Sequence, residues 1–195
     1  MRCPSLRPLA LTLLAVCLTG VVQVHAQDVT EATLKGAFIF NFARFADWPS
    51  DALAASTGVN ACVVGDRAVS ESLSRAVSGQ KLNGRSIQVS IVDAKGPLPA
   101  CHLLYVSGVE RQQLEDIVFR LRDTPVLTVS DDDAFIRLGG IIQVFVEHGK
   151  MRFRINPRSA RRARLQLSSR LLTLAVLVDE DPLPLPPAGP GPQAR

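Results

Sequence analysis

Cysteine and histidine are the residue types in this sequence best suited to redox or metal chemistry, and the chain has four of the first and three of the second. Two cysteines, Cys3 and Cys17, lie within the first 26 residues, which predict a secretory signal. The mature chain would therefore keep Cys62 and Cys101. An even pair in an oxidising compartment predicts a disulfide, and two buried free thiols are the alternative. Closing a loop of about 40 residues in this way stabilises a fold by roughly 4 kcal/mol in the chain-entropy model.

The signal prediction rests on three features of the first 26 residues. Arg2 and Arg7 give a positive start, an apolar run follows over 9–22, and the segment ends at Ala26. A membrane anchor is the alternative, but the run is interrupted and shorter than the roughly 20 residues that a spanning helix needs. We therefore expect export to the periplasm with cleavage after Ala26.

The other polar motifs do not predict a catalytic or metal site. His102 and His148 have no second ligand at a metal spacing, so we expect no bound metal. Ser130 precedes three aspartates, and negative charge before a helix is favoured by capping and by the helix dipole, which we prefer to a cation cluster. Segment 65–68 stands where a dinucleotide-binding fold places its phosphate loop, but it has one glycine where the fingerprint needs three. Without a visible nucleophile, base and orienting partner, we expect neither an enzyme nor a cofactor.

A basic region follows near the end of the chain. From Lys150 to Arg170 there are eight basic residues and no acidic one. Four arginines crowd the first turns of a predicted last helix, namely Arg158, Arg161, Arg162 and Arg164. Because cations at a helix start oppose its dipole, local stability does not explain them. They form either a solvated face or a contact for an anionic partner, which would be an acidic protein surface, a phosphate-bearing ligand or the lipid surface.

Phe40 is the remaining candidate contact residue. It lies in a first helix predicted over 34–49, whose apolar stripe consists of Leu34, Phe38, Phe42 and Phe45. Phe40 points away from that stripe. It is either covered by another element or part of a protein interface, and we favour burial.

Predicted strands and helices alternate along the chain. Strands are predicted over 59–64, 86–92, 102–106 and 126–129, and helices over 68–78 and 110–122. After a short helix ending at Gly139-Gly140, the pattern predicts a hairpin of 141–147 with 150–155, and then a long last helix from Asn156. The stripe of that helix consists of Leu165, Leu172 and Val176.

This alternation predicts an α/β fold with a mainly parallel sheet that ends in an antiparallel hairpin, is flanked by helices and is Rossmann-like. We expect a signal peptide over 1–26, one domain over 27–178 and a proline-rich, disordered tail over 179–195. Removing the signal leaves 20 basic against 18 acidic residues, a net charge of +2, which argues against a nucleic-acid partner.

Four blocks of the sequence resemble the YfiR family of small periplasmic repressors. The first is LKGAFIFNFARFADWP at 34–49. The others follow in family order: 127–131, then 139–147, then 150–156 followed by a helix that carries 167–172. Together these blocks extend from about residue 30 to residue 178.

The resemblance implies a dimeric repressor that holds an inner-membrane diguanylate cyclase inactive, and so controls cyclic di-GMP and biofilm behaviour. It also implies an outer-membrane lipoprotein that sequesters the repressor, and a disulfide between the strands that carry Cys62 and Cys101. Some relatives have a second bridge, for which this mature chain has no cysteines left. A sensor for a small anionic ligand near the last helix is the alternative function, and a periplasmic enzyme is a third.

Overall fold

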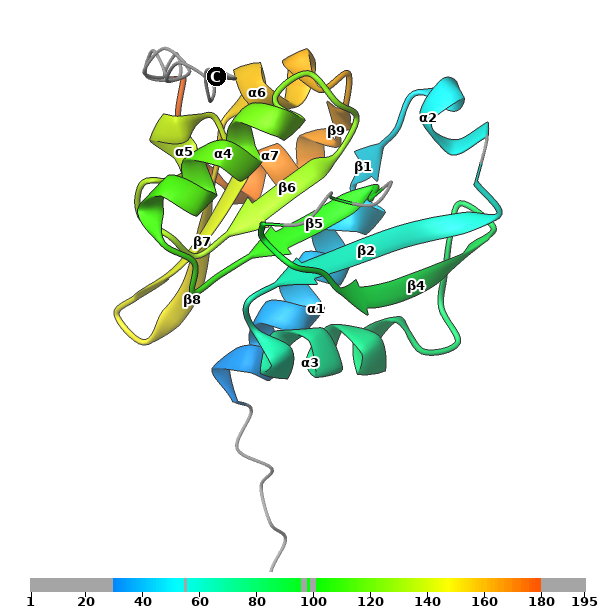
Figure 1. Ribbon diagram of the computed structural model, residues 1–195, viewed down its shortest axis with the longest axis horizontal. Coiled ribbons are helices and arrows are strands. Elements are labelled where there is room, and N and C mark those ends of the chain that lie inside the picture. The colour runs from blue at the N-terminus through cyan, green and yellow to red at the C-terminus, as the bar shows by residue number, and fades with distance from the viewer. Residues whose placement is uncertain (1–29, 55, 96–97, 99–100, 180–195) are drawn as a thin grey trace, which may run out of the picture.

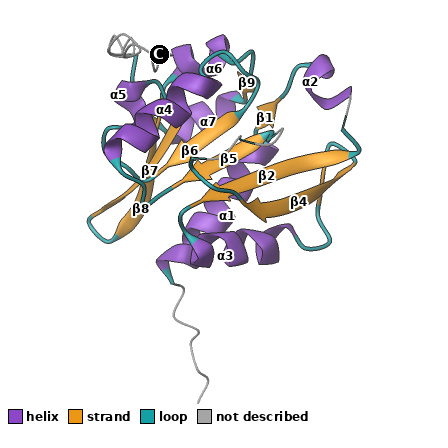
Figure 2. Cartoon of the chain, in the orientation of Figure 1, coloured by secondary structure: helices purple, strands orange, loops and turns teal. Residues whose placement is uncertain are grey.

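The computed structural model describes residues 30–54, 56–95, 98 and 101–179. Its main sheet has eight strands in the order β10-β8-β7-β6-β5-β2-β4-β3, and helices cover both faces (Figures 1 and 2). These strands are β2 (Gly58–Val64), β3 (Lys81–Leu82), β4 (Arg85–Ile91), β5 (Leu103–Val106), β6 (Leu127–Ser130), β7 (Ile142–Glu147), β8 (Lys150–Ile155) and β10 (Val176–Leu177). A second, two-stranded sheet pairs β1 (Ala46–Asp47) with β9 (Gln166–Leu167).

The central strands run parallel, as the alternating pattern predicts. β2 pairs in parallel with β4 and β5, β5 with β6, and β6 with β7, whereas β7 and β8 form an antiparallel hairpin. The helices are α1 (Glu31–Arg44), α2 (Ser50–Ala54), α3 (Arg67–Val77), α4 (Arg111–Leu121), α5 (Phe135–Leu138), α6 (Pro157–Arg162) and α7 (Ser169–Leu174). The predicted α/β class with its closing hairpin is therefore confirmed.

Two hydrophobic cores lie on opposite faces of the sheet. The first is built by α1, α3 and the segment from α6 to α7, which contribute Ile39, Leu73 and Leu171. The second is built by α4 and α5, which contribute Leu114 and Phe135. Because strand side chains alternate between faces, one strand supplies both cores: Tyr105 of β5 belongs to the first and Leu104 to the second.

The face of α1 that packs on the sheet is rotated from the predicted stripe. Its buried residues are Gly36, Ile39, Phe42 and Ala43, while Leu34 is 38% exposed. The reason is the close approach of α3, since a Cβ atom added at Gly36 would lie 2.8 Å from the backbone of Leu73. A helix this close turns its smallest residue toward its neighbour, and Phe38 and Phe45 become only partly buried.

The prediction of one long last helix is wrong. α6 ends at Arg162, Arg164 adopts a left-handed backbone with φ 57°, and the chain then forms β9 and the separate helix α7. The break lets Leu165 enter the first core and lets Leu167 pair with Ala46 of β1. A continuous helix would have kept this segment away from α1. Of the predicted stripe, Leu165 is buried, Leu172 is half-buried and Val176 is exposed in β10.

The predicted disulfide is present between Cys62 and Cys101, whose Cα atoms are 6.0 Å apart. Cys62 lies within β2, not at its start, and Cys101 precedes the neighbouring parallel strand β5. Both belong to the second core, beneath α4. The signal peptide and residues 180–195 of the predicted tail fall outside the described residues.

We expect Cys62→Ser to lower the melting temperature by roughly 10 °C under oxidising conditions, because the bridge closes a separation of 39 residues. Scanning calorimetry with and without reductant measures this. Cys101→Ser should give the same loss, and reductant should lower the wild type to the level of both variants. Equal melting of oxidised wild type and variants would contradict a stabilising bridge.

The rotated face of α1 predicts different costs for two truncations in one helix. Ile39→Ala removes a fully buried side chain from the first core and should lower the free energy of unfolding by about 2–5 kcal/mol. Leu34→Ala removes a partly exposed one and should lower it by less than about 1 kcal/mol. Urea unfolding of both variants measures the difference. Equal costs would contradict the rotated face, and a larger cost for Leu34→Ala would mean that the stripe predicted from sequence is the packed face.

Candidate functional site

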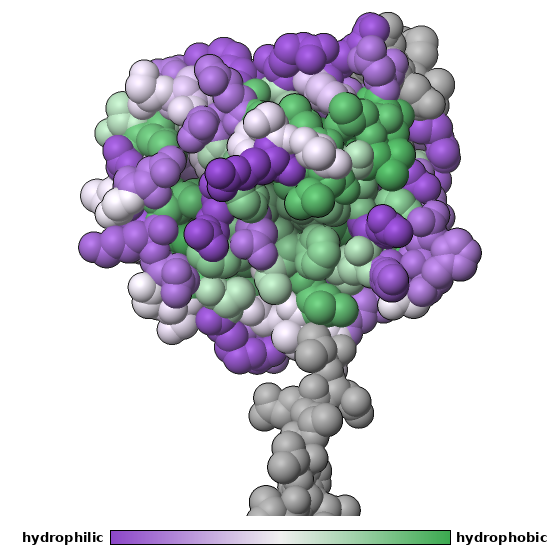
Figure 3. Space-filling view, turned by 180° about the vertical axis from the view of Figure 1, so that it is seen from behind, coloured by the Kyte–Doolittle hydropathy of each residue, from purple (hydrophilic) through white to green (hydrophobic). Residues whose placement is uncertain are grey.

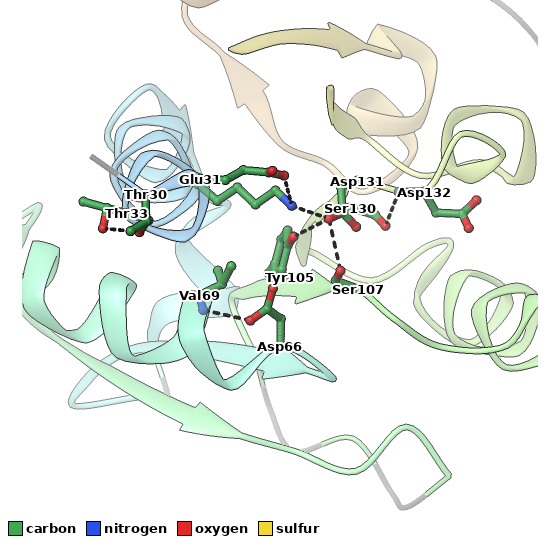
Figure 4. A network of polar contacts seen from close by, with 11 residues as sticks. Thr30, Glu31, Thr33, Asp66, Val69, Tyr105, Ser107, Ser130, Asp131 and Asp132 are labelled. Carbon is green, nitrogen blue, oxygen red and sulfur yellow. Dashed lines mark hydrogen bonds and ion pairs between the residues drawn. The ribbon is translucent and has the colours of Figure 1, made fainter. Parts of the chain in front are cut away.

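A polar cluster lies at the carboxyl ends of β5 and β6, where open α/β sheets place their ligands. Asp131 follows β6, and its Oδ2 atom accepts hydrogen bonds from Tyr105 at 3.0 Å and Ser107 at 3.1 Å (Figure 4). Lys35 of α1 reaches the same oxygen at 2.6 Å and contacts Glu31 at 2.7 Å. Residues from α1, β5 and β6 therefore meet on one carboxylate oxygen.

The cluster holds its ionisable groups in their ordinary charged or neutral forms. Burial alone would raise the pKa of Asp131, but hydrogen bonds from Lys35, Ser107 and Tyr105 outweigh it, and the pKa is lowered. Burial would lower the pKa of Lys35, yet its hydrogen bonds to Asp131 and Glu31 raise it. Burial and then the charge of Asp131 raise the pKa of Tyr105. The carboxylate is thus a poor proton acceptor and the ammonium a poor donor near neutral pH, so the arrangement favours a structural tie over acid–base catalysis.

The three aspartates after Ser130 make different contacts, which the sequence did not indicate. Asp132 Oδ1 accepts the backbone N–H of Ala134 at 2.8 Å in the turn before α5, but Ala134 is itself the N-cap residue, so α5 lacks the side-chain cap that the sequence predicted. Asp131 does not cap the helix but binds Lys35. Asp133 accepts a hydrogen bond from Gln143. Within the described residues, no group of three or more histidine, cysteine, aspartate or glutamate side chains could hold a metal ion.

The two histidines serve different segments of the fold. His102 is buried: its Nδ1 accepts the backbone N–H of Asn60, and its Nε2 lies 3.2 Å from the carbonyl oxygen of Ala52. Its own carbonyl accepts the indole N–H of Trp48. His148 is exposed in the turn between β7 and β8. His102 therefore ties α2 and Trp48, which follows β1, to the sheet.

The crevice that a nucleotide would need between β2 and β5 is filled by backbone. Gly65 has φ +89°, and a Cβ atom there would lie 1.9 Å from the carbonyl oxygen of Ser107. Asp66 then caps α3 by accepting the N–H of Val69. The single glycine serves a close approach of two loops, which is consistent with the absent dinucleotide fingerprint.

The predicted arginines do not form one patch on a helix. Arg158, Arg161 and Arg162 are in α6, whereas Arg164 follows the break. Arg158 pairs with Asp179 at 2.5 Å, and Arg164 pairs with Asp51 at 2.9 Å. Arg162 donates to Ser159, and Arg161 is exposed. Carboxylates from distant segments therefore offset part of the positive charge. Phe40 is half-buried against the first core, with the Arg44 guanidinium 5.8 Å from its ring centre.

A hydrophobic surface that sequence reasoning missed lies at the β10 edge of the sheet. Leu174 is 72% exposed, and Val176 and Leu177 are each 53% exposed. Hydrophobic side chains also gather on the face of the molecule that is turned away in Figure 1, where α1 and α7 cover the sheet (Figure 3). The signal in the sequence is the apolar run at 171–178 directly before the proline-rich tail, which includes Leu172 and Val176 of the predicted helix stripe. We call Leu174, Val176 and Leu177 the β10 surface.

A groove of about 420 Å³ opens beside this edge. Its lining includes Asp133, Arg137, Gln143 and Arg154. The amide of Gln143 is buried, donates to Asp133 and accepts from Arg154, whose guanidinium stacks 3.9 Å above the centre of the Phe145 ring. The groove thus presents fixed charges of both signs near the carboxyl edge of the sheet.

The cluster around Asp131 predicts a loss of stability in acid. The lowered pKa means that its contribution is present above the unfolded value of about 4 and is lost as the pH falls through the folded value. Asp131→Asn should lower the free energy of unfolding by about 2 kcal/mol at pH 7, with the gap to wild type closing below about pH 4. Urea titrations across this range measure it. Asp123→Asn, which changes an exposed carboxylate, should track the wild type, and a gap independent of pH would exclude the ionised Asp131 as the cause.

Comparison with known proteins identifies the chain at the family level. No helix among the described residues is long and apolar enough to cross a membrane. A search of curated proteins finds no match. The family model described as YfiR/HmsC-like matches residues 32–176, which include the Asp131 cluster, the disulfide and α7. Such a match implies a periplasmic regulator of a diguanylate cyclase, in a family that is not known for catalysis. The match extends over most of the chain, and the protein therefore belongs to the YfiR/HmsC-like family.

Proposed function

We propose that this protein is a periplasmic regulator that binds and represses an inner-membrane diguanylate cyclase, and so lowers cyclic di-GMP and biofilm formation. The observation that carries the proposal is the β10 surface of a protein in a regulatory family: Val176 and Leu177, on the two faces of the outermost strand, and Leu174 at the end of α7 are all exposed. Exposed apolar residues that are grouped, unlike single scattered ones, mark surfaces that bind other proteins. The periplasmic region of the cyclase is the proposed partner.

Several features support binding over catalysis. The Asp131 cluster joins three elements and keeps its charges near neutral pH, His102 is occupied by backbone groups, and the crevice at Gly65 is filled. Arg161 and Arg170 are exposed in α6 and α7, the elements that lead to β10, and they would suit acidic residues at the rim of a partner. Charged rims of this kind raise the association rate more than the affinity.

Repression by binding is a shift between states of the cyclase. The regulator lowers activity only if it binds the inactive state better than the active one, and the size of the shift equals that difference in affinity. An outer-membrane lipoprotein that sequesters the regulator would reverse the shift by competition. We place the mature protein in the periplasm as a homodimer, after cleavage of the signal peptide at Ala26.

A sensor of a small anionic ligand is the second candidate function, and the groove at Arg137 and Arg154 favours it. The groove lies at the carboxyl edge of the sheet, and the Gln143 amide and the Phe145 ring orient the Arg154 guanidinium. An oriented guanidinium suits a carboxylate or phosphate group. Two observations separate the functions. A sensor should carry a bound small ligand when it is purified, whereas a repressor should change cyclic di-GMP through the cyclase.

The test of repression is cellular cyclic di-GMP in a deletion strain, measured by mass spectrometry. We expect a rise that the wild-type gene reverses. Leu174→Asp should fail to reverse it, because a charge at the β10 surface disfavours burial in an interface. Reversal of the charges at Arg158, Arg161 and Arg162 should weaken repression less, since rim charges contribute little affinity.

The control is Phe119→Asp, which places the same charge at an exposed phenylalanine of α4 on the opposite face of the sheet. It should repress as the wild type does, and circular dichroism should show that both variants fold. Full repression by Leu174→Asp would remove the β10 surface from the proposal. No change in cyclic di-GMP on deletion would overturn repression itself and favour the sensor.

A further inference from the structure

A second groove, of about 270 Å³, opens at the carboxyl end of the sheet, between the start of α1 and β7. One side of its lining is polar and consists of Glu31, Lys35, Asp131 and Asp133. The other side is apolar and consists of Val144, Phe145, Val146 and Met151. Sites for small molecules usually enclose roughly 300–1,000 Å³, so a groove of this size suits a single long side chain better than a cofactor.

The groove crosses an open edge of β7. β6 ends at Ser130, and its pairing with β7 extends no further than Gln143. β7 continues to Glu147 and so projects past the end of its neighbour, in the hairpin at the lower left of Figure 1. Because consecutive strand residues point to opposite faces, a groove lined by all three of residues 144–146 must run across the strand edge. The projecting end of β7 is therefore one wall of the groove.

This wall offers an apolar strip and unpaired backbone groups. Val146 is 56% exposed, and Met151 lies directly opposite it in the hairpin, so the two side chains share one face. The backbone N–H of Asn156 donates to Ile141, which places the odd-numbered residues of β7 toward β8. Val146 therefore turns its own N–H and C=O to the open side. Such a strip suits the methylene stem of a long side chain that carries a charged head.

The polar side of the groove has more acceptors than donors. Its cation, Lys35, already contacts Asp131 at 2.6 Å and Glu31 at 2.7 Å (Figure 4). Asp131 receives its three side-chain hydrogen bonds on Oδ2. Glu31 is contacted at Oε1, and Asp133 accepts from Gln143 at Oδ1. Among the described residues, no donor is bonded to the other oxygen of these three carboxylates.

The charges of the lining do not balance either. Three carboxylates face one ammonium, which leaves two negative charges. The positive end of α1 offsets about half a charge of this surplus. A metal ion is not the missing counter-charge, because in the part of the chain that the structure describes no group of three acidic, histidine or cysteine side chains could hold one. An organic cation with several N–H donors and an apolar stem fits both sides of the groove.

We propose that this groove binds a lysine or arginine side chain of a partner protein. The charged head lies at the free oxygens of Glu31 and Asp133, and the methylene stem lies along Val146 and Met151. The groove is separate from the β10 surface, because β8 stands between β7 and β10 in the sheet. The inference therefore goes beyond repression of the cyclase. Its failure would leave that function standing, and an unchanged cyclic di-GMP level on deletion would leave the groove standing.

A short peptide tests the groove directly. The probe is the blocked tripeptide acetyl-Gly-Arg-Gly-amide, titrated at constant ionic strength into the isotope-labelled protein and followed by amide NMR. We expect saturable shifts of the backbone amides of Glu31, Val146 and Met151. The matched control peptide carries citrulline, which has the shape of arginine without its charge. It should bind at least about fivefold more weakly, because hydrogen bonds to carboxylates are stronger from a charged donor.

Variants of the protein identify the carboxylates that bind the probe. Glu31→Gln and Asp133→Asn each remove one negative charge from an exposed side chain and should raise the dissociation constant of the arginine peptide at least about threefold. The matched control is Glu71→Gln, an exposed position on α3 outside the lining, which should leave the constant unchanged. Equal binding of the two peptides, shifts that miss the groove or do not saturate, or equal effects of Glu31→Gln and Glu71→Gln would overturn the proposal.

Discussion

The placement of α1 across the sheet is the constraint on which the rest of the structure depends. At one side, Gly36 allows the backbone of α3 to approach within contact distance. At the other, the ring of Phe42 lies 5.0 Å from that of Phe153 in β8, and Phe38 packs on both. α1 therefore bridges the half of the sheet that contains β2 and β4 and the half that contains β7 and β8. Moving it would uncover both halves of the first core.

The Asp131 cluster fixes how α1 lies on the first hydrophobic core. Hydrophobic packing is not directional, and a helix on a flat stripe can slide or rotate at small cost. The bond from Lys35 to Asp131 has a direction, and Tyr105 and Ser107 fix the carboxylate from the sheet side. A partly buried ion pair often adds little net stability, because desolvation opposes the Coulomb attraction. Its effect here is on geometry: together with the close contact of α3 at Gly36, it is consistent with the rotation that turns Ile39 inward and Leu34 outward.

The sequence predicted the parts of the fold that depend on local periodicity, and it failed where distant segments decide. The helix predicted over 68–78 is α3, where Val69, Leu73 and Val77 recur at steps of four and are buried. The pairing of Cys62 with Cys101 followed from counting. The stripe of α1 was misplaced because Gly36 has no apolar signal, and its role appears only when α3 lies against it. The last helix was overextended because arginine at 164 gives no sign of a left-handed backbone, whereas the β1–β9 pairing that requires the break joins residues more than a hundred positions apart.

The same reasoning explains why the candidate site was the least predictable part. The arginines stood out as a run of like charge, but a run in sequence says nothing of its partners, and Asp51 and Asp179 come from opposite ends of the domain. The surface proposed for binding the cyclase has the opposite character, since its residues are apolar and looked like core positions. Val176 carries a β-branched side chain in a strand and differs from buried valines only in that it lies in β10, the outermost strand of the sheet. Strand order is a property of the whole fold, and an exposed edge can be recognised only once that order is known.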